Sequence, residues 1–207
     1  MKCLASFLKE TNAASAAEFA LVLPSALLLL FGIIDVGNYA WTLNQYEKAT
    51  QMGTRFAVVT DVLSEPLITE TYVGYECGGR ELVAGERICA EALGTLTCTS
   101  DGCVCDLDPC PAGTPSDVEI DAFGRLVDRM RNFQPQIADD AVQVEYRGSG
   151  LGFAGDPRGP QIAPIVTVRI VDAAYTPITL SPLGVRVPLP DFSYSLTMED
   201  GEGRTSS

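Results

Sequence analysis

The chain has 207 residues, of which 46% are hydrophobic and 20% charged, enough for a long helix and one modest globular core. Its net charge of −13 gives an acidic surface that repels phosphate backbones, so nucleic-acid binding is disfavoured. Histidine is absent, which excludes Ser-His-Asp and Cys-His nucleophilic sites and removes the usual general base near neutral pH.

An apolar segment runs from Ala13 to Ile34, and Glu18 is its only ionisable residue. About 22 residues at 1.5 Å per residue reach roughly 33 Å, the thickness of one hydrocarbon core. Lys2 and Lys9 precede this segment, whereas no Lys or Arg follows it for more than ten residues. The positive-inside rule therefore predicts a single span with a cytoplasmic N-terminus and the remainder of the chain outside.

A cleaved secretory signal peptide is the alternative to a retained anchor. Residues 35–43 contain no A-x-A cleavage site, and the pattern continues as a helix with one apolar stripe. Tyr39 and Trp41 also lie where aromatic rings gather at membrane interfaces. These features favour the retained anchor and a helix over residues 14–60, ended by Pro66. The stripe comprises Tyr39, Leu43, Tyr46, Gly53, Phe56 and Ala57.

Six of the seven cysteines lie close together, and an even cluster of this kind is typical of disulfides in an oxidising compartment. A metal site is the alternative, but its usual C-x-x-C pairs are missing, because the spacing is C-x-C followed by C-x-x-x-x-C. The sequence leaves the pairing open and disfavours only a bond between Cys103 and Cys105, which one residue separates. The six are Cys77, Cys89, Cys98, Cys103, Cys105 and Cys110.

The remaining pattern predicts a disulfide-stabilised periplasmic α+β lobe over residues 66–200. We expect a short helical stretch at 87–93, a loop held by cystines at 98–115, and an amphipathic helix introduced by a capping box at 116–119. Strands are predicted at 142–146, 165–171 and 192–198, the last with clean alternation. A long helix, a short helix and an antiparallel sheet define the α+β class.

Two further segments lack a regular pattern. Residues 175–190 are apolar and rich in proline, and we expect them to pack beneath the sheet. Their alternative role is a docking surface for another subunit or for the membrane. Residues 201–207 are small and polar and are predicted to form a disordered tail.

Three stretches together resemble the TadE-like family: AASAAEF from Ala13, the following ALVLPSALLLLFGIID, and the later QYEKATQMGTRFAV. The resemblance covers roughly residues 12–57. The family typically reads G-A-x-x-V-E-F-A-L-V-L-P, then an apolar run, then a small-residue-rich helix ending in G-A-R. Its proteins resemble type IV pilins of the tight-adherence (Flp) class and serve pilus assembly as inner-membrane or minor-pilin components.

The resemblance also assigns roles to residues near the start of the chain. Some family members are cut by a prepilin peptidase, with the glutamate as the fifth residue after the cut. Counting back from Glu18 puts the new N-terminus at Ala14 and the residue before the cut at Ala13, where the family has Gly. Residues 1–13 are then a candidate leader. Glu18 would face the free amine of a neighbouring subunit, since opposite charges offset each other's burial.

The resulting hypothesis is a minor pilin or assembly factor of a Tad pilus, in the bacterial inner membrane or in the pilus itself. Its partners would be membrane lipid, other pilin-like or Tad assembly subunits and a prepilin peptidase. A membrane-tethered periplasmic protein without a pilus role is the first alternative, and an envelope hydrolase is the second. We expect no catalytic, cofactor-binding or metal site, because histidine and a G-x-S-x-G motif are absent.

Overall fold

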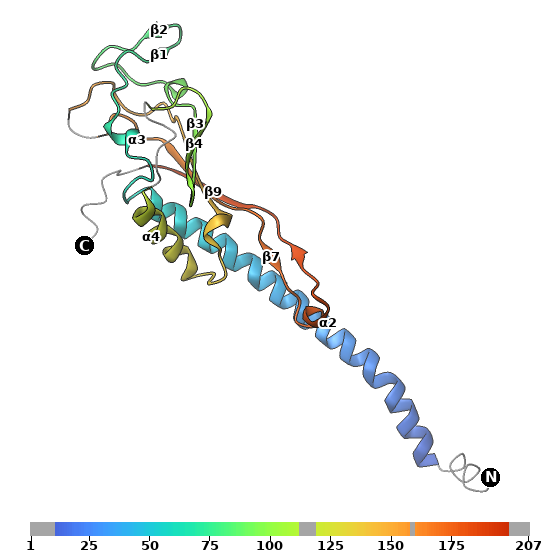
Figure 1. Cartoon of the computed structure of the whole chain (residues 1–207). Coiled ribbons are helices and arrows are strands. Elements are labelled where there is room, and N and C mark those ends of the chain that lie inside the picture. The colour runs from blue at the N-terminus through green and yellow to red at the C-terminus, as the bar shows by residue number, and fades with distance from the viewer. Residues whose placement is uncertain (1–10, 112–118, 158–159, 199–207) are drawn as a thin grey trace. The chain divides into compact units, whose positions relative to one another are not determined.

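The computed structural model describes residues 11–111, 119–157 and 160–198 (Figure 1). The chain forms two compact units. The helical unit comprises Met1–Thr42 and Tyr175–Val187, and the sheet unit comprises Leu43–Ala174 and Pro188–Ser207. The class is α+β, as predicted, with a long apolar helix, an antiparallel sheet and a further helix. Cys3 and the predicted tail at 201–207 lie outside the described residues.

The long helix α2 covers Thr11–Ala57 and ends before the position that the sequence predicts. The β-branched residues Val58 and Val59 follow it, and such side chains lose rotamer freedom in a helix. Val58 is buried in the sheet unit, as are Val62 and Leu63 of the connecting segment. The expectation that Pro66 ends the long helix is therefore wrong. Pro66 instead begins the short helix α3 (Pro66–Thr69), where its missing N–H has no cost.

Five antiparallel strands form the main sheet, in the order β4-β3-β5-β6-β9. The predictions for β5, β6 and β9 are confirmed to within a residue at each end. The loop predicted over 98–115 is wrong in part, because residues on both sides of a tight turn pair as β3 and β4. The strands are β3 (Thr95–Thr99), β4 (Gly102–Leu107), β5 (Val142–Arg147), β6 (Ile165–Ile170) and β9 (Phe192–Thr197).

The core of the sheet unit lies between the sheet and helix α4 (Ile120–Arg131). Phe123, Leu126 and Met130 are buried on one face of α4, which confirms the predicted amphipathic helix. Alternate residues of β5 and most of β6 face the same core. The predicted capping box is wrong at its acidic end, since Glu119 occupies the N-cap without a side-chain hydrogen bond, and Ser116 lies outside the described residues.

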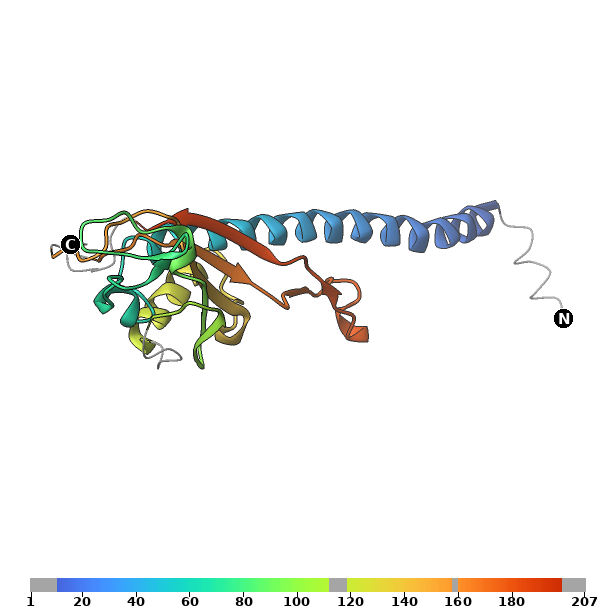
Figure 2. The same ribbon diagram turned by 90° about the horizontal axis from the view of Figure 1, so that it is seen from above.

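The C-terminal part of α2 completes this core, and Figure 2 shows β9 running beside it. Tyr46 stacks on Phe192 of β9, with ring centroids 5.3 Å apart. A Cβ at Gly53 would lie 2.8 Å from Met130 Cγ, so the absence of a side chain lets α2 and α4 approach closely. The buried positions of α2 recur at helical spacing, as the predicted stripe requires. They are Tyr46, Ala49, Thr50, Gly53, Thr54 and Ala57.

A buried tyrosine joins the segment after α2 to the sheet. Tyr146 of β5 is 1% exposed, and its hydroxyl oxygen accepts a hydrogen bond from the Leu63 N–H at 3.2 Å. Burial raises the pKa of Tyr146 to about 12. The hydroxyl therefore stays neutral at physiological pH and serves as a fixed acceptor inside the core.

The smaller elements modify one further expectation. The helical stretch expected at 87–93 reduces to a single turn, because Cys89 just before it has an extended backbone. The chain between β5 and β6 returns through a glycine-bearing loop in which Gly152 and Ile162 form an isolated bridge. The remaining elements are β1 (Glu76–Cys77), β2 (Arg80–Glu81), η1 (Ala90–Ala92), η2 (Asp139–Ala141), β7 (Ala174–Tyr175), η3 (Ser181–Leu183) and β8 (Val187–Pro188).

The expectation that residues 175–190 pack beneath the sheet is wrong for most of the segment. Ile178, Leu180, Leu183 and Val185 are exposed, and only Leu189 among the aliphatic residues of the segment is buried. Prolines recur through the segment and prevent a continuous central strand. The loop Tyr175–Val187, here called the apolar loop, belongs to the helical unit and contacts α2.

Candidate functional site

The N-terminal part of α2 exposes a continuous apolar surface. The whole helix has 47 residues, and one 18-residue window has a mean hydropathy of 2.4 with none of its residues buried. α2 is therefore long and apolar enough to cross a membrane, as the sequence predicts. Pro24 lies inside the helix and interrupts its series of backbone hydrogen bonds. The Ser25 hydroxyl next to it donates a hydrogen bond to the Val22 carbonyl at 2.8 Å. Exposed side chains include Phe19, Leu21, Val22, Leu28, Leu29, Leu30, Phe31, Ile33 and Ile34.

The predicted processing and pairing residues lie on this helix. Ala13 and Ala14 are in the first turns of α2, and Glu18 follows one turn later with an exposed side chain. Among the described residues, none forms an ion pair with Glu18. An exposed carboxylate on an apolar helix is available to a group outside the chain.

Asp35 is a second acidic residue on this helix and was missed as a site by the sequence reasoning. It accepts hydrogen bonds from the N–H groups of Ile178 at 2.8 Å and Thr179 at 3.2 Å, and from the Thr179 hydroxyl. The Tyr175 hydroxyl donates to the Asp35 backbone carbonyl at 3.3 Å. An acidic residue directly after an apolar run is a signal that sequence reasoning could have used. Its partners, about 140 positions away, give no such signal.

All six clustered cysteines form disulfides in the sheet unit. Cys77 bonds to Cys89, Cys98 to Cys103, and Cys105 to Cys110, so the disfavoured bond between Cys103 and Cys105 does not occur. The second bond crosses the β3–β4 hairpin between residues that are register partners. Within the first loop, Glu86 accepts from the Val83 N–H and pairs with Arg80 at 2.6 Å. These contacts lower the pKa of Glu86.

Cys105, Asp108 and Cys110 place potential metal-ligand atoms within 4.8 Å of one another. Both sulfur atoms are bonded to each other in the structure. A cysteine binds metal as a free thiolate, so this cluster can serve as a metal site only after reduction. The geometry thus favours the disulfide interpretation of the cysteine cluster over the metal alternative.

We expect intact-mass measurement with alkylation to find six additional reactive thiols in the protein after reduction. The six correspond to the three bonds of the sheet unit. Peptide mapping without reductant should recover the three cross-linked pairs. Alkylation of these cysteines in the native, unreduced protein would contradict the disulfide framework and reopen the metal alternative.

The Cys77–Cys89 bond should add the most to the free energy of unfolding, because it closes the longest of the three loops. Its contribution is about 3 kcal/mol, against about 2 kcal/mol for each of the two shorter loops.

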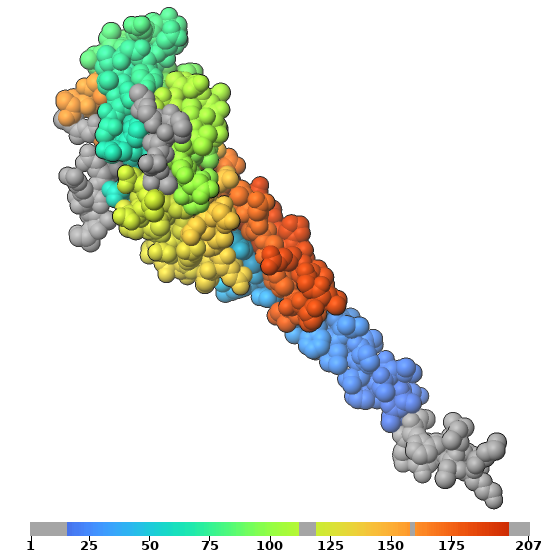
Figure 3. All heavy atoms as spheres, viewed as in Figure 1, coloured from blue at the N-terminus to red at the C-terminus, as the bar shows by residue number. Residues whose placement is uncertain are grey.

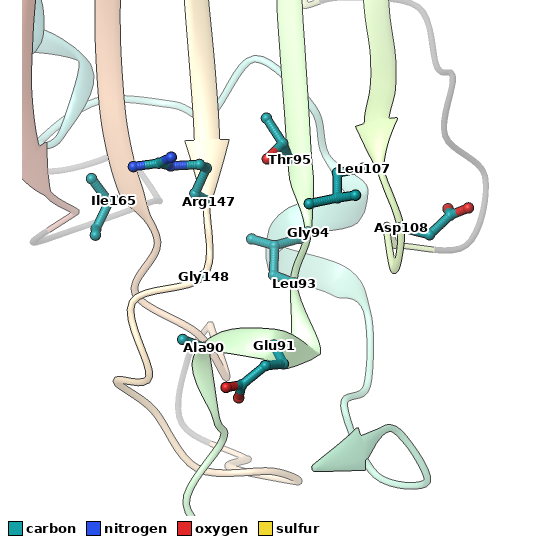
Figure 4. A pocket seen from close by; sticks show the side chains of 10 residues that line it. All are labelled: Ala90, Glu91, Leu93, Gly94, Thr95, Leu107, Asp108, Arg147, Gly148 and Ile165. Atoms are coloured by element: carbon teal, nitrogen blue, oxygen red, sulfur yellow. The ribbon is translucent and has the colours of Figure 1, made fainter. Parts of the chain in front are cut away.

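An open hollow of about 420 Å³ lies at one end of the sheet unit (Figure 4). Its charged lining residues are Arg147, Glu91 and Asp108. In Figure 4 the Arg147 side chain points toward Ile165, while the Asp108 carboxylate points away on the opposite side. Arg147 pairs with Glu145 at 3.2 Å. Of the described charged residues of the hollow, Arg147 and Asp108 thus point in different directions.

No curated protein and no solved structure matches the chain. The family assignment concerns the part of the chain that contains the apolar helix, its proline and its small-residue continuation. Residues 13–55, about a fifth of the chain, match the family model described as TadE-like protein, which confirms the resemblance found in the sequence.

Proposed function

We propose that this chain is a membrane-anchored minor pilin or assembly factor of a Tad (Flp, type IVb-like) pilus and acts through contacts with other subunits. The observation that carries the proposal is the match of residues 13–55 to the TadE-like family. That segment includes the exposed apolar surface of α2 and Glu18. The role proposed for the protein is structural rather than catalytic.

The anchor is placed in the bacterial inner membrane with the sheet unit in the periplasm. The two lysines before the apolar segment support this orientation, since positive charge is retained on the cytoplasmic side. Three disulfides in the sheet unit support it independently, because such bonds persist in oxidising compartments. The lysines and the disulfides thus both support a periplasmic location of the sheet unit.

Subunit contact is assigned to the exposed face of α2. In water this surface would aggregate, whereas in a membrane or a pilus bundle it packs against lipid or against other apolar helices. Glu18 supplies one charge on that surface, suited to the free amine of a neighbouring subunit. A prepilin peptidase acting between Ala13 and Ala14 would create such an amine on this chain too.

Deletion of the gene, with plasmid-borne complementation, tests the pilus role. We expect loss of sheared surface pili and their return with the intact gene. Normal pilus yield in the deletion strain would contradict the pilus role and favour a membrane-tethered protein with a pilin-like anchor.

N-terminal sequencing of the mature protein decides between three possible starts of the chain: Ala14, the full N-terminus, and the residue after a cleaved signal peptide.

We expect a reporter fused after Ser207 to be active when it functions only in the periplasm. A cytoplasm-only reporter at the same position should be silent, because the single span carries the sheet unit across the membrane. Activity is measured in intact cells and normalised to fusion-protein level. A matched pair of fusions directly after Lys9 should give the reverse pattern. Activity of the cytoplasmic reporter after Ser207 would overturn the topology.

A further inference from the structure

The apolar loop exposes hydrophobic side chains, and its one charged residue, Arg186, lies near its end. Ile178 is 61% and Leu183 75% exposed, with Leu180 and Val185 exposed between and beyond them. Residues 176–185 contain no charged side chain. A contiguous exposed apolar surface of this kind is typical of contact with another molecule or with a membrane.

Asp35 fixes the position of this loop along α2. Its carboxylate accepts hydrogen bonds from the N–H groups of Ile178 and Thr179, which lie in the exposed part of the loop. Figure 3 shows the orange-to-red atoms of the loop lying against the blue helix. Asp35 directly follows the uncharged run from Phe19 to Ile34. The loop is therefore held where the apolar run of α2 ends.

Aromatic residues give a second indication of depth. Tyr39 and Trp41 lie about 6 and 9 Å beyond Asp35 along the helix, at 1.5 Å per residue. The Tyr39 ring meets the Tyr175 ring of the loop edge-on, with centroids 5.5 Å apart. Trp and Tyr gather at headgroup level in membrane proteins. The end of the apolar run, Asp35 and the aromatic rings thus mark one membrane boundary, and the loop lies at it.

We propose that the apolar loop is a second membrane contact, which rests in the headgroup–acyl boundary of the periplasmic leaflet and is held at that depth by Asp35. The occupant of its surface is lipid. The Asp35 carboxylate and the loop N–H groups satisfy one another, as polar backbone groups near hydrocarbon require. Arg186, at the end of the loop, is exposed and suited to headgroup phosphates. The inference rests on the membrane anchorage in the proposed function and deepens it.

Tryptophan depth measurements on the full chain in vesicles test this proposal. Trp41 is the only tryptophan, so Trp41→Phe gives a silent background. Leu183→Trp reports on the loop, Leu28→Trp on the middle of the apolar run, and Val104→Trp on an exposed apolar position of β4. The vesicles contain phosphatidylcholine and phosphatidylglycerol, with bromine on the acyl chain either near the headgroup or deep. Soluble iodide is the opposing quencher.

We expect Leu183→Trp to lose most of its emission to shallow bromine and little to iodide, and Val104→Trp to behave in the opposite way. Quenching of Leu183→Trp by iodide alone would overturn the proposal, since the loop would then lie in water rather than in lipid. Loss of deep-bromine quenching in Leu28→Trp would instead mean that α2 does not span the membrane. No pilus component is present, so a failed pilus role leaves these results unchanged.

Asp35→Ala in the Leu183→Trp chain tests the positioning role of the carboxylate. We expect shallow-bromine quenching to fall and iodide quenching to rise, because the loop N–H groups lose their acceptor. Thr179→Val removes only the hydroxyl donor and should give a smaller change in the same direction. Unchanged quenching in Asp35→Ala would show that Asp35 does not hold the loop. Deep-bromine quenching of Leu28→Trp in the same background controls for insertion.

Discussion

Glu18→Ala is expected to leave a normally inserted protein in cells that assemble few pili. Removing a carboxylate from an apolar helix makes insertion easier, because its burial cost disappears. In an assembled bundle the same change leaves a neighbour's amine buried and unpaired, at a cost of about 3–5 kcal/mol. An equilibrium shift of that size corresponds to a loss of assembled pili of about a hundredfold or more. Membrane level and sheared pilus yield are measured in the same strain.

Two variants make the Glu18 result specific. Glu18→Asp keeps the charge on a shorter side chain and should retain part of the pilus yield. Glu47→Ala removes another exposed carboxylate of α2, beyond the apolar segment, and should leave yield unchanged. Full pilus yield from Glu18→Ala at normal membrane level would end the charge-pairing role. A low level of the Glu18→Ala protein in the membrane would instead indicate that Glu18 is needed for membrane insertion.

Local periodicity predicted much of the fold because the elements concerned each bury one face. Phe192 and Ser193 of β9 alternate between buried and exposed, and α4 repeats its apolar residues at helical spacing. The apolar run of α2 was equally clear, since about 20 such residues suffice for a span. In each case the signal lies within one element and needs no knowledge of its neighbours.

Other features depend on contacts between distant segments and were not predictable in this way. Turn-forming residues around Cys98 and Cys103 suggested a loop, yet pairing with β5 extends that stretch into the sheet. The Cys98–Cys103 disulfide likewise joins register partners of β3 and β4, which the sequence spacing alone does not identify. Asp35 and Thr179 meet across about 140 positions, so neither half of the contact predicts the other. The exposed state of the apolar loop follows from that contact and not from its hydrophobicity.

Gly94→Ala is expected to destabilise the sheet unit by about 2–3 kcal/mol and lower its unfolding temperature by about 5–10 °C. A Cβ at Gly94 would lie 1.7 Å from the Leu107 carbonyl oxygen and 2.6 Å from the Leu107 carbonyl carbon. Backbone atoms cannot rotate away, so the ends of β3 and β4 must separate. The Gly94 N–H also donates to the Pro109 carbonyl at 2.6 Å, a bond that separation weakens.

Gly124→Ala is the matched control for that variant, since it adds the same methyl group at a position with no atom within 4 Å apart from its chain neighbours and the adjacent backbone of its own helix. Gly124 lies inside α4, where Ala is favoured over Gly by about 0.5–1 kcal/mol. The Gly124→Ala variant should therefore have a slightly higher unfolding temperature than the unchanged chain. Calorimetry of the full chain in detergent, without reductant, measures both variants. Equal behaviour of the two would contradict the close approach of β3 and β4 at Gly94, because helix propensity alone does not produce the loss expected for Gly94→Ala.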